Sequence, residues 1–295
     1  MGISRVAIVG LGLMGGPLAT LFLKAGYDVI GYDVITEQMS QLRPLGLKPS
    51  TTPGEAVRES DLIVLSLPNW NIVRDVVEGE GGILSGAHSG QIIIDTSTVP
   101  PWETRTMAEK LAKKGIEWMD APISGSSAQA RVGNIVFMLG GKKIVFDEIK
   151  PVLDRIAKKV VYVGEHGDAA MLKLIVNHTF FINQAAAIEG MVLGLKAGLR
   201  PDIMLDVLSS GAASSDLIKA RGEDMLNGNY EPKGPVAIAV KDLTLSLETA
   251  RRLGVVLPIG ALYHQFIMKA HYNGWDQKDS TIVMKIYEQL AGIDN

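Results

Sequence analysis

The feature that most constrains this chain is a glycine-rich turn close to its N-terminus. Three glycines are spaced as G-x-G-x-x-G between a predicted strand at Arg5–Val9 and a predicted helix at Met14–Ala25. The strand and helix give the motif its meaning, because the glycines alone occur in many unrelated turns. In this setting the first glycine permits a tight turn, the second allows a pyrophosphate to approach, and the third lets the helix pack against the strand. The predicted dinucleotide-binding residues are Gly10, Leu11, Gly12, Leu13, Met14 and Gly15.

A carboxylate follows the second predicted strand, Asp28–Tyr32. Asp33 lies 18 residues after Gly15, near the position where an acidic residue accepts hydrogen bonds from the ribose hydroxyls of the cofactor. The same charge repels a 2′-phosphate, so the sequence favours NAD over NADP. The alternative is that Asp33 only caps the next turn.

The first half of the chain alternates short β-branched runs with helical patterns. Such alternation predicts an α/β, Rossmann-type doubly wound, mainly parallel sheet, and near-continuous apolar strands fit burial on both faces. Further strands are predicted at Leu62–Leu67, Ile92–Asp95, Glu117–Asp120, Ile135–Leu139 and Val160–Val163, and a helix at Glu103–Lys114.

Near Gly164 the sequence pattern changes from alternating strands and helices to helices alone. A long pattern without proline at 169–196 predicts one extended helix, followed by helical patterns at 201–209, 215–226, 238–253, 258–272 and 279–290. We therefore expect an NAD-binding Rossmann domain at 1–164. An all-helical substrate and oligomerisation domain is expected at 165–295, built on a long interdomain helix.

Composition excludes several classes of function. The chain has 295 residues, a formal net charge of −3 and no cysteine, so we expect neither a nucleic-acid partner nor a disulfide framework. The five histidines show no metal-ligand spacing, and no metal site is predicted. No apolar run reaches the ~18 residues of a membrane-spanning helix. The N-terminal apolar run breaks at once into glycines, unlike a signal peptide, and a cytoplasmic location is expected.

Two more loops belong to the predicted cofactor site. Leu67 and Pro68 end one strand, and Thr98 follows the next. Open α/β sheets bind ligands at the carboxyl ends of their strands. From position alone, both loops are equally well explained as ordinary strand-to-helix turns.

The candidate chemical groups lie further along the chain. Lys173 and Asn177 are spaced i, i+4, so an ammonium and a carboxamide share one face of the long helix. A desolvated lysine there can serve as general acid or base. Ser124, with the backbone N–H groups of Gly125 and Ser126, can form a nest for a carboxylate. A solvated surface pair and an ordinary Ser/Gly loop are the alternatives.

Taken together, these segments resemble the β-hydroxyacid dehydrogenase family, which includes 3-hydroxyisobutyrate dehydrogenase and tartronate semialdehyde reductase. The resemblance covers nearly the whole chain. Its motifs are the opening G-L-G-L-M-G-G-P-L-A, the D-A-P-I-S-G at 120–125, the Gly140-Gly141 pair, the K-x-x-x-N at 173–177 and the K-D-L at 241–243.

The resemblance implies a hydride transfer between NAD and a small 3-hydroxy acid, or its semialdehyde, without a metal. Lys173 would exchange the proton and Asn177 would orient the substrate. Ser124, Gly125 and Ser126 would hold the substrate carboxylate. On the cofactor side, Thr98 would lie beside the nicotinamide, Leu67 and Pro68 would line the site, and Lys241 would reach over it. The family usually forms homodimers or homotetramers.

Some positions depart from the family pattern. Ser126 replaces the second glycine of the usual S-G-G, and Gly234 stands where P-G-F has its aromatic residue. Loss of the aromatic residue would enlarge the pocket, and Lys233 would supply a charge for a second acidic group on the substrate. Two alternatives remain open: a reductase of another small carbonyl or imine, and a non-catalytic dinucleotide-binding module.

Overall fold

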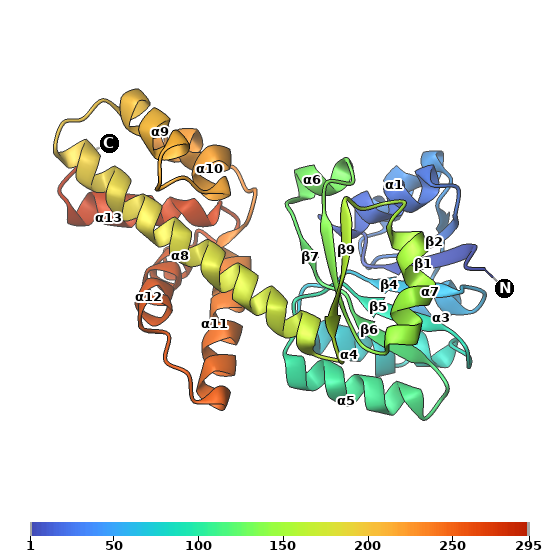
Figure 1. Cartoon of the computed structure of the whole chain (residues 1–295). Helices are drawn as coiled ribbons and strands as arrows, with labels where there is room; N and C mark the ends of the chain where they lie inside the picture. Colours follow the sequence, from blue (N-terminus) through green and yellow to red (C-terminus); the bar gives the residue numbers. More distant parts are fainter. Residues whose placement is uncertain (1, 294–295) are drawn as a thin grey trace. The chain divides into compact units, whose positions relative to one another are not determined.

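The computed structural model describes residues 2–293, and its contacts divide the chain into two compact units between Lys173 and Leu174. The first unit is built on one nine-stranded sheet (Figure 1). Its strand order is β3-β2-β1-β4-β5-β6-β8-β7, with β9 beside β8. The strands are β1 (Arg5–Val9), β2 (Asp28–Tyr32), β3 (Lys48–Pro49), β4 (Leu62–Leu65), β5 (Ile92–Asp95), β6 (Glu117–Asp120), β7 (Ile123–Ser124), β8 (Val136–Gly140) and β9 (Lys159–Gly164).

All strand pairs are parallel except those that β8 makes with β6 and β7. The order reverses between β1 and β4, because the chain runs outward through β2 and β3 before it returns to the other side of β1. Such a reversal opens a crevice at the carboxyl ends of the two strands, where ligands bind in folds of this kind.

Helices cover both faces of this sheet, so its central strands are buried on both sides. In β1, Val6 and Ile8 join one apolar core, whereas Ala7 and Val9 join the other. This alternation follows from the two-residue period of a strand. The first core receives side chains from α1 (Gly15–Lys24), α2 (Thr36–Leu42), α6 (Ser127–Arg131) and α7 (Lys143–Leu153). The second receives side chains from α3 (Pro53–Val57), α4 (Trp70–Glu78) and α5 (Pro101–Ala112).

The second unit is helical throughout its described part. Within residues 174–293, extended pairing is limited to an isolated bridge between Pro235 and Asp279. The elements are α8 (Asp168–Lys196), α9 (Pro201–Ser210), α10 (Asp216–Leu226), α11 (Val236–Leu253), α12 (Pro258–Tyr272), the 3-10 turn η3 (Ser280–Ile282) and α13 (Val283–Leu290). Helix α8 begins in the first unit and continues into the second. The predicted fold class, a Rossmann-type sheet followed by an all-helical part, is confirmed.

The structure adds elements that the periodicity did not predict. They are the strands β3 and β7, the helices α2, α3, α4, α6 and α7, and the 3-10 turns η1 (Arg43–Leu45) and η2 (Ile83–Ser85). The helix expected at 279–290 starts as η3, with the Asp279 carboxylate accepting a hydrogen bond from the Thr281 N–H at 3.1 Å. Between residues 2 and 293, no helix is both long enough and apolar enough to cross a membrane.

Candidate active site

The glycine-rich turn is shaped by close backbone packing. Gly10 has φ +91°, and a Cβ at this residue would lie 2.3 Å from the Ser66 carbonyl oxygen. A Cβ at Gly15 would lie 1.8 Å from the Gly10 carbonyl oxygen. Both positions therefore require glycine, the first because of its backbone conformation and the second because α1 starts directly against the turn.

Gly12 differs from its two neighbours in the motif. A Cβ there would meet no atom within 4 Å, so it would project into open space ahead of α1. The first turn of α1 carries no acidic residue. A helix N-terminus with free N–H groups and room for close approach fits a pyrophosphate. Leu11 is buried in the core and Leu13 is exposed, so the turn runs from the core to the protein surface.

The Asp33 carboxylate connects the end of β2 to the glycine-rich turn. Its Oδ2 accepts a hydrogen bond from the Leu11 N–H at 2.7 Å, and its Oδ1 accepts one from the Ile35 N–H at 2.8 Å. The second contact is a turn cap, as the alternative interpretation expects. The residues that follow, Val34 and Ile35, are exposed and apolar, and the segment 33–36 has no basic side chain.

The turns after β1, β4 and β5 meet at one edge of the sheet. The Leu67 side chain lies 3.1 Å from where a Gly10 Cβ would be. The Leu67 N–H donates to the Ser97 hydroxyl at 3.0 Å, and the Ser97 N–H donates to Asp95 at 2.9 Å. Pro68 and Thr98 are the next residues in these turns. The structure thus brings the predicted Leu67–Pro68 and Thr98 turns to the glycine-rich turn.

The segment that follows β6 is attached to the start of α8. Asp120 is buried, and its two oxygens accept hydrogen bonds from the Gly167 and Ala170 N–H groups, each at 2.9 Å. Burial raises the pKa of Asp120 above its ordinary value, against the opposing effect of these hydrogen bonds. Three residues later along α8, the Lys173 Nζ donates to the Ile123 carbonyl at 2.7 Å. Lys173 is therefore held next to Ser124.

The predicted carboxylate nest is partly occupied by the protein itself. Gly125 has φ +142°, and a Cβ there would lie 2.9 Å from the Ile135 side chain. Ser126 caps α6: its N–H donates to Gln129 Oε1 at 2.8 Å, and its hydroxyl accepts the Gln129 N–H at 3.2 Å. A substrate carboxylate would therefore compete with Gln129 for the Ser126 N–H, whereas Ser124 has no such competitor in the capping box.

In the second unit, Asp242 joins two predicted site residues. The Asn177 Nδ2 donates to Asp242 Oδ2 at 2.6 Å, and the Lys241 ammonium lies 3.3 Å from Asp242 Oδ1. The Asp242 side chain is 3% exposed. Because a carboxylate only accepts hydrogen bonds, this contact sets which way the Asn177 amide points and leaves its carbonyl oxygen as an acceptor.

Asp120 and Asp242 belong to the D-A-P-I-S-G and K-D-L motifs, but the sequence alone assigns neither of them a role. The available signal was their position beside predicted site residues: Asp120 opens the D-A-P-I-S-G segment and Asp242 follows Lys241. Asp120 accepts hydrogen bonds from the Gly167 and Ala170 N–H groups. Asp242 accepts one from the Asn177 side chain. These contacts could not be found from the sequence because they join segments far apart along the chain.

Lys233, considered above as a charge for a second acidic group, is already paired. Its ammonium contacts the Asp224 carboxylate, and its N–H donates to Asp279 at 3.0 Å. The side-chain hydrogen bond from Lys233 lowers the pKa of Asp224. The charge of Lys233 is therefore balanced within the helical unit.

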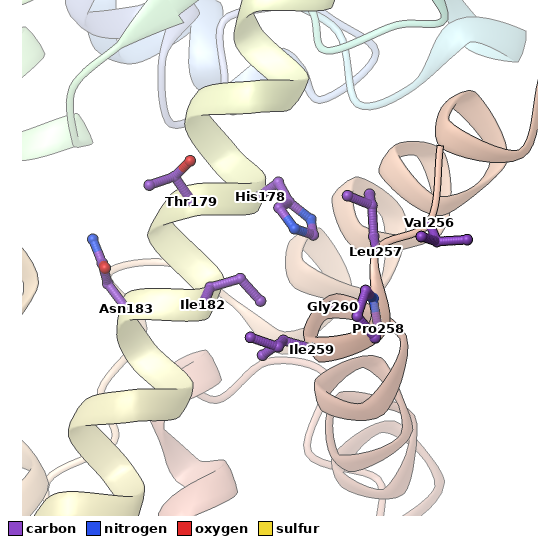
Figure 2. Close-up of a pocket in the computed structure, with 9 residues that line it drawn as sticks. All are labelled: His178, Thr179, Ile182, Asn183, Val256, Leu257, Pro258, Ile259 and Gly260. Atoms are coloured by element: carbon purple, nitrogen blue, oxygen red, sulfur yellow. The ribbon is translucent and has the colours of Figure 1, made fainter. Parts of the chain in front are cut away.

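A separate apolar cavity of about 320 Å³ lies between the middle of α8 and the start of α12 (Figure 2). His178 points into it, and its ring packs against Gly260, where a Cβ would lie 2.3 Å from the His178 Cε1. Burial lowers the pKa of His178, and its Nδ1 has no hydrogen-bond partner among residues 2–293. In the described chain no three acidic or histidine side chains are grouped to hold a metal.

Comparisons with known proteins agree with this architecture along the whole chain. Residues 5–164 match the NAD binding domain of 6-phosphogluconate dehydrogenase. Residues 167–287 match the NAD-binding model of NADP-dependent 3-hydroxyisobutyrate dehydrogenase.

Individual relatives carry the names of hydroxy-acid dehydrogenases. The 2-(hydroxymethyl)glutarate dehydrogenase of Eubacterium barkeri is 33% identical over 290 residues, which are 98% of this chain and 96% of the relative. The L-threonate dehydrogenase of Cupriavidus necator is 33% identical, over 96% of each chain. The crystal structure of 3-hydroxyisobutyrate dehydrogenase from Salmonella typhimurium has a TM-score of 0.89 and 30% identity, covering 96% of this chain and 99% of that chain. This chain therefore belongs to the β-hydroxyacid dehydrogenase family, and it is an oxidoreductase with NAD(P)-binding domains.

Proposed function

We propose that this protein transfers a hydride between NAD and a small 3-hydroxy acid, similar to 3-hydroxyisobutyrate, or its semialdehyde. The observation that carries the proposal is the hydrogen bond from Lys173 Nζ to the Ile123 carbonyl. It holds a potential proton donor and acceptor beside Ser124, at the end of the D-A-P-I-S-G segment. The substrates named for the relatives above share a hydroxyl on the carbon β to a carboxylate, which supports this substrate class.

In this reaction each residue has a separate task. Bound NAD would supply hydride-transfer chemistry at the alcohol carbon, and Lys173 would exchange the proton with the substrate oxygen. Asn177 orients the substrate with an amide that Asp242 holds in one orientation. Ser124 and Gly125 bind the carboxylate, and Ser126 joins them when its N–H exchanges Gln129 for a substrate oxygen.

The cofactor is proposed to bind to residues 1–164, along the turn from Gly10 to Gly15. Thr98 would then lie beside the nicotinamide, Leu67 and Pro68 would line the site, and Lys241 would hold the cofactor from the helical domain. The preference for NAD rests on the Asp33 carboxylate and on the absence of a basic side chain in the segment 33–36. A 2′-phosphate there would face a negative charge with no cation to offset it.

We assign residues 165–295 to substrate binding and self-association as a homodimer or homotetramer. Large apolar side chains are exposed on several of its elements, which favours an interface between copies. They include Ile203, Val207, Val256, Ile259 and Leu262. Light scattering after gel filtration tests this assignment, and a monomer of 31.7 kDa at micromolar concentration would contradict it.

The most informative experiment is a substrate panel assayed with NAD and with NADP separately. The panel contains 3-hydroxyisobutyrate, glycerate, serine, threonate and 2-(hydroxymethyl)glutarate, together with a cyclic imine. Oxidation of at least one 3-hydroxy acid with NAD supports the proposal. Turnover of the imine alone would replace it with an imine reductase, and NAD(P) binding without turnover of any compound would indicate a non-catalytic module.

A further inference from the structure

A guanidinium group stands directly in front of Gly234. A Cβ at this glycine would lie 3.1 Å from Arg221 Nη2 and 3.5 Å from Nη1. Arg221 is on α10, and Gly234 is in the segment that leads into α11. Any side chain at this position would press on the guanidinium, so glycine here leaves Arg221 in its present place.

Asp279 holds Arg221 by only one of its nitrogens. Arg221 Nη1 donates to both Asp279 oxygens, at 2.6 and 2.5 Å. The same carboxylate accepts the Lys233 and Gly234 N–H groups, so it anchors the arginine and the loop together. Arg221 Nε and Nη2 have no hydrogen-bond acceptor among residues 2–293, and 11% of the side chain is exposed. The arginine is thus fixed in position with unused donors.

Arg221 also lies close to the Asn177 face of α8. Its Cζ is 5.6 Å from the centroid of the Phe180 ring. Phe180 follows Asn177 by three residues, so both lie on one face of the helix, about 4.5 Å apart along its axis. The guanidinium therefore contacts the face of α8 that carries Asn177, at a residue three positions further along the helix.

We propose that Arg221 is a specificity-determining residue that binds a second carboxylate on the substrate, making this enzyme selective for hydroxy dicarboxylic acids. The proposal rests on the proposed function, which places the substrate at Asn177. A guanidinium offers a planar pair of N–H donors that matches a carboxylate, and its fixed position lowers the entropic cost of binding. The Lys233 ammonium already contacts Asp224 and the Ala220 carbonyl, whereas Arg221 keeps two guanidinium nitrogens without an acceptor among residues 2–293.

The test compares two hydroxy acids that differ in the second carboxylate: 3-hydroxyisobutyrate and 2-(hydroxymethyl)glutarate. The measured quantity is the ratio of kcat/KM for the dicarboxylate to kcat/KM for the monocarboxylate. The wild type is expected to favour the dicarboxylate. Arg221→Lys keeps a cation for Asp279 but loses the planar fork, and the ratio should fall about 10- to 100-fold, as expected for a charge-assisted hydrogen bond. This change should appear as a higher KM for the dicarboxylate, with kcat close to the wild-type value.

Two further variants keep the test decisive. Gly234→Ala displaces the guanidinium without removing it, so it should lower the same ratio even if Arg221→Lys fails to fold. Lys219→Met removes an exposed cation from the same helix and should leave the ratio unchanged. A wild type that favours the monocarboxylate, or variants that change both substrates equally, would overturn the role of Arg221 alone. Failure of the wild type to turn over any hydroxy acid would overturn the proposed function as well.

Discussion

The Asn177 amide and the Asp242 carboxylate form a hydrogen bond of 2.6 Å between α8 and α11. Asp242 is buried and also lies 3.3 Å from the Lys241 ammonium. One carboxylate therefore orients a residue proposed to bind substrate and another proposed to bind cofactor.

Asp242→Asn should impair catalysis more than stability. The amide offers a single acceptor oxygen, so it cannot serve both Asn177 and Lys241. We expect kcat/KM for the hydroxy acid to fall about 10- to 100-fold, the range for a lost charge-assisted hydrogen bond. Steady-state kinetics measure this effect. Asp216→Asn, an exposed residue at the start of α10, is the matched control, and an equal loss in both variants would contradict the role of Asp242.

Lys173→Ala should abolish turnover without affecting cofactor binding. Removing a general acid or base typically lowers the rate about 10²- to 10⁴-fold. Steady-state assays measure kcat, and titration of cofactor fluorescence measures the Kd for NADH. Lys196→Ala, in the last turn of the same helix, should behave like the wild type. Substantial activity of the Lys173 variant would remove Lys173 from the mechanism.

Gly12→Ala should mainly weaken NAD binding, whereas Gly15→Ala should mainly lower stability. A methyl group at Gly12 projects into open space, so the free energy of unfolding should stay within about 0.5 kcal/mol of wild type, as for other surface substitutions. It would also occupy the space proposed for the pyrophosphate, so the Kd for NAD should rise roughly tenfold or more.

At Gly15 the added Cβ would overlap the Gly10 carbonyl oxygen. Overpacking of this kind should lower the free energy of unfolding by about 1–3 kcal/mol. Denaturant titration and calorimetric binding distinguish the two variants. If Gly12→Ala binds NAD as tightly as the wild type, the proposed cofactor position is wrong.

Asp33→Asn should reduce the preference for NAD. The amide oxygen can still accept the Leu11 N–H, so the turn is retained, but the charge that repels a 2′-phosphate is lost. The ratio of kcat/KM for NAD to that for NADP should fall about tenfold or more, since like charges in close contact cost several kcal/mol. Asp28→Asn, at the other end of β2, is the control. A wild type that prefers NADP would refute the inference from Asp33.

His178 should make the protein less stable in mild acid. Burial lowers the pKa of His178 below 6.5 in the folded state, whereas the unfolded chain has the ordinary value. Below pH 6.5 the unfolded state thus binds more protons, so the free energy of unfolding falls as the pH decreases toward the folded pKa.

His178→Gln removes this titration. The stability advantage of the wild type over the variant, measured by urea unfolding, should therefore be smaller at pH 5 than at pH 7. An advantage that stays constant between the two pH values would show that His178 makes no such contribution.

The sequence by itself determined the fold class and the location of the glycine-rich turn. Strands such as Ile92–Asp95 and helices such as Pro258–Tyr272 are encoded by local periodicity, because side-chain direction repeats every two or 3.6 residues. The glycine spacing around Gly12 is equally local. By contrast, β3 and β7 are two residues each, and such short strands exist only through pairing with their neighbours.

The tertiary structure alone decided which polar groups meet. Asp120 reaches Gly167, Asp242 reaches Asn177, and Arg221 lies in front of Gly234 only because the helices and strands pack as they do. Hydrogen bonds are short and directional, so a shift of one ångström in packing would break such pairs while leaving every local pattern intact. The sequence therefore indicates which chemical groups are present, and the fold determines which of them act together.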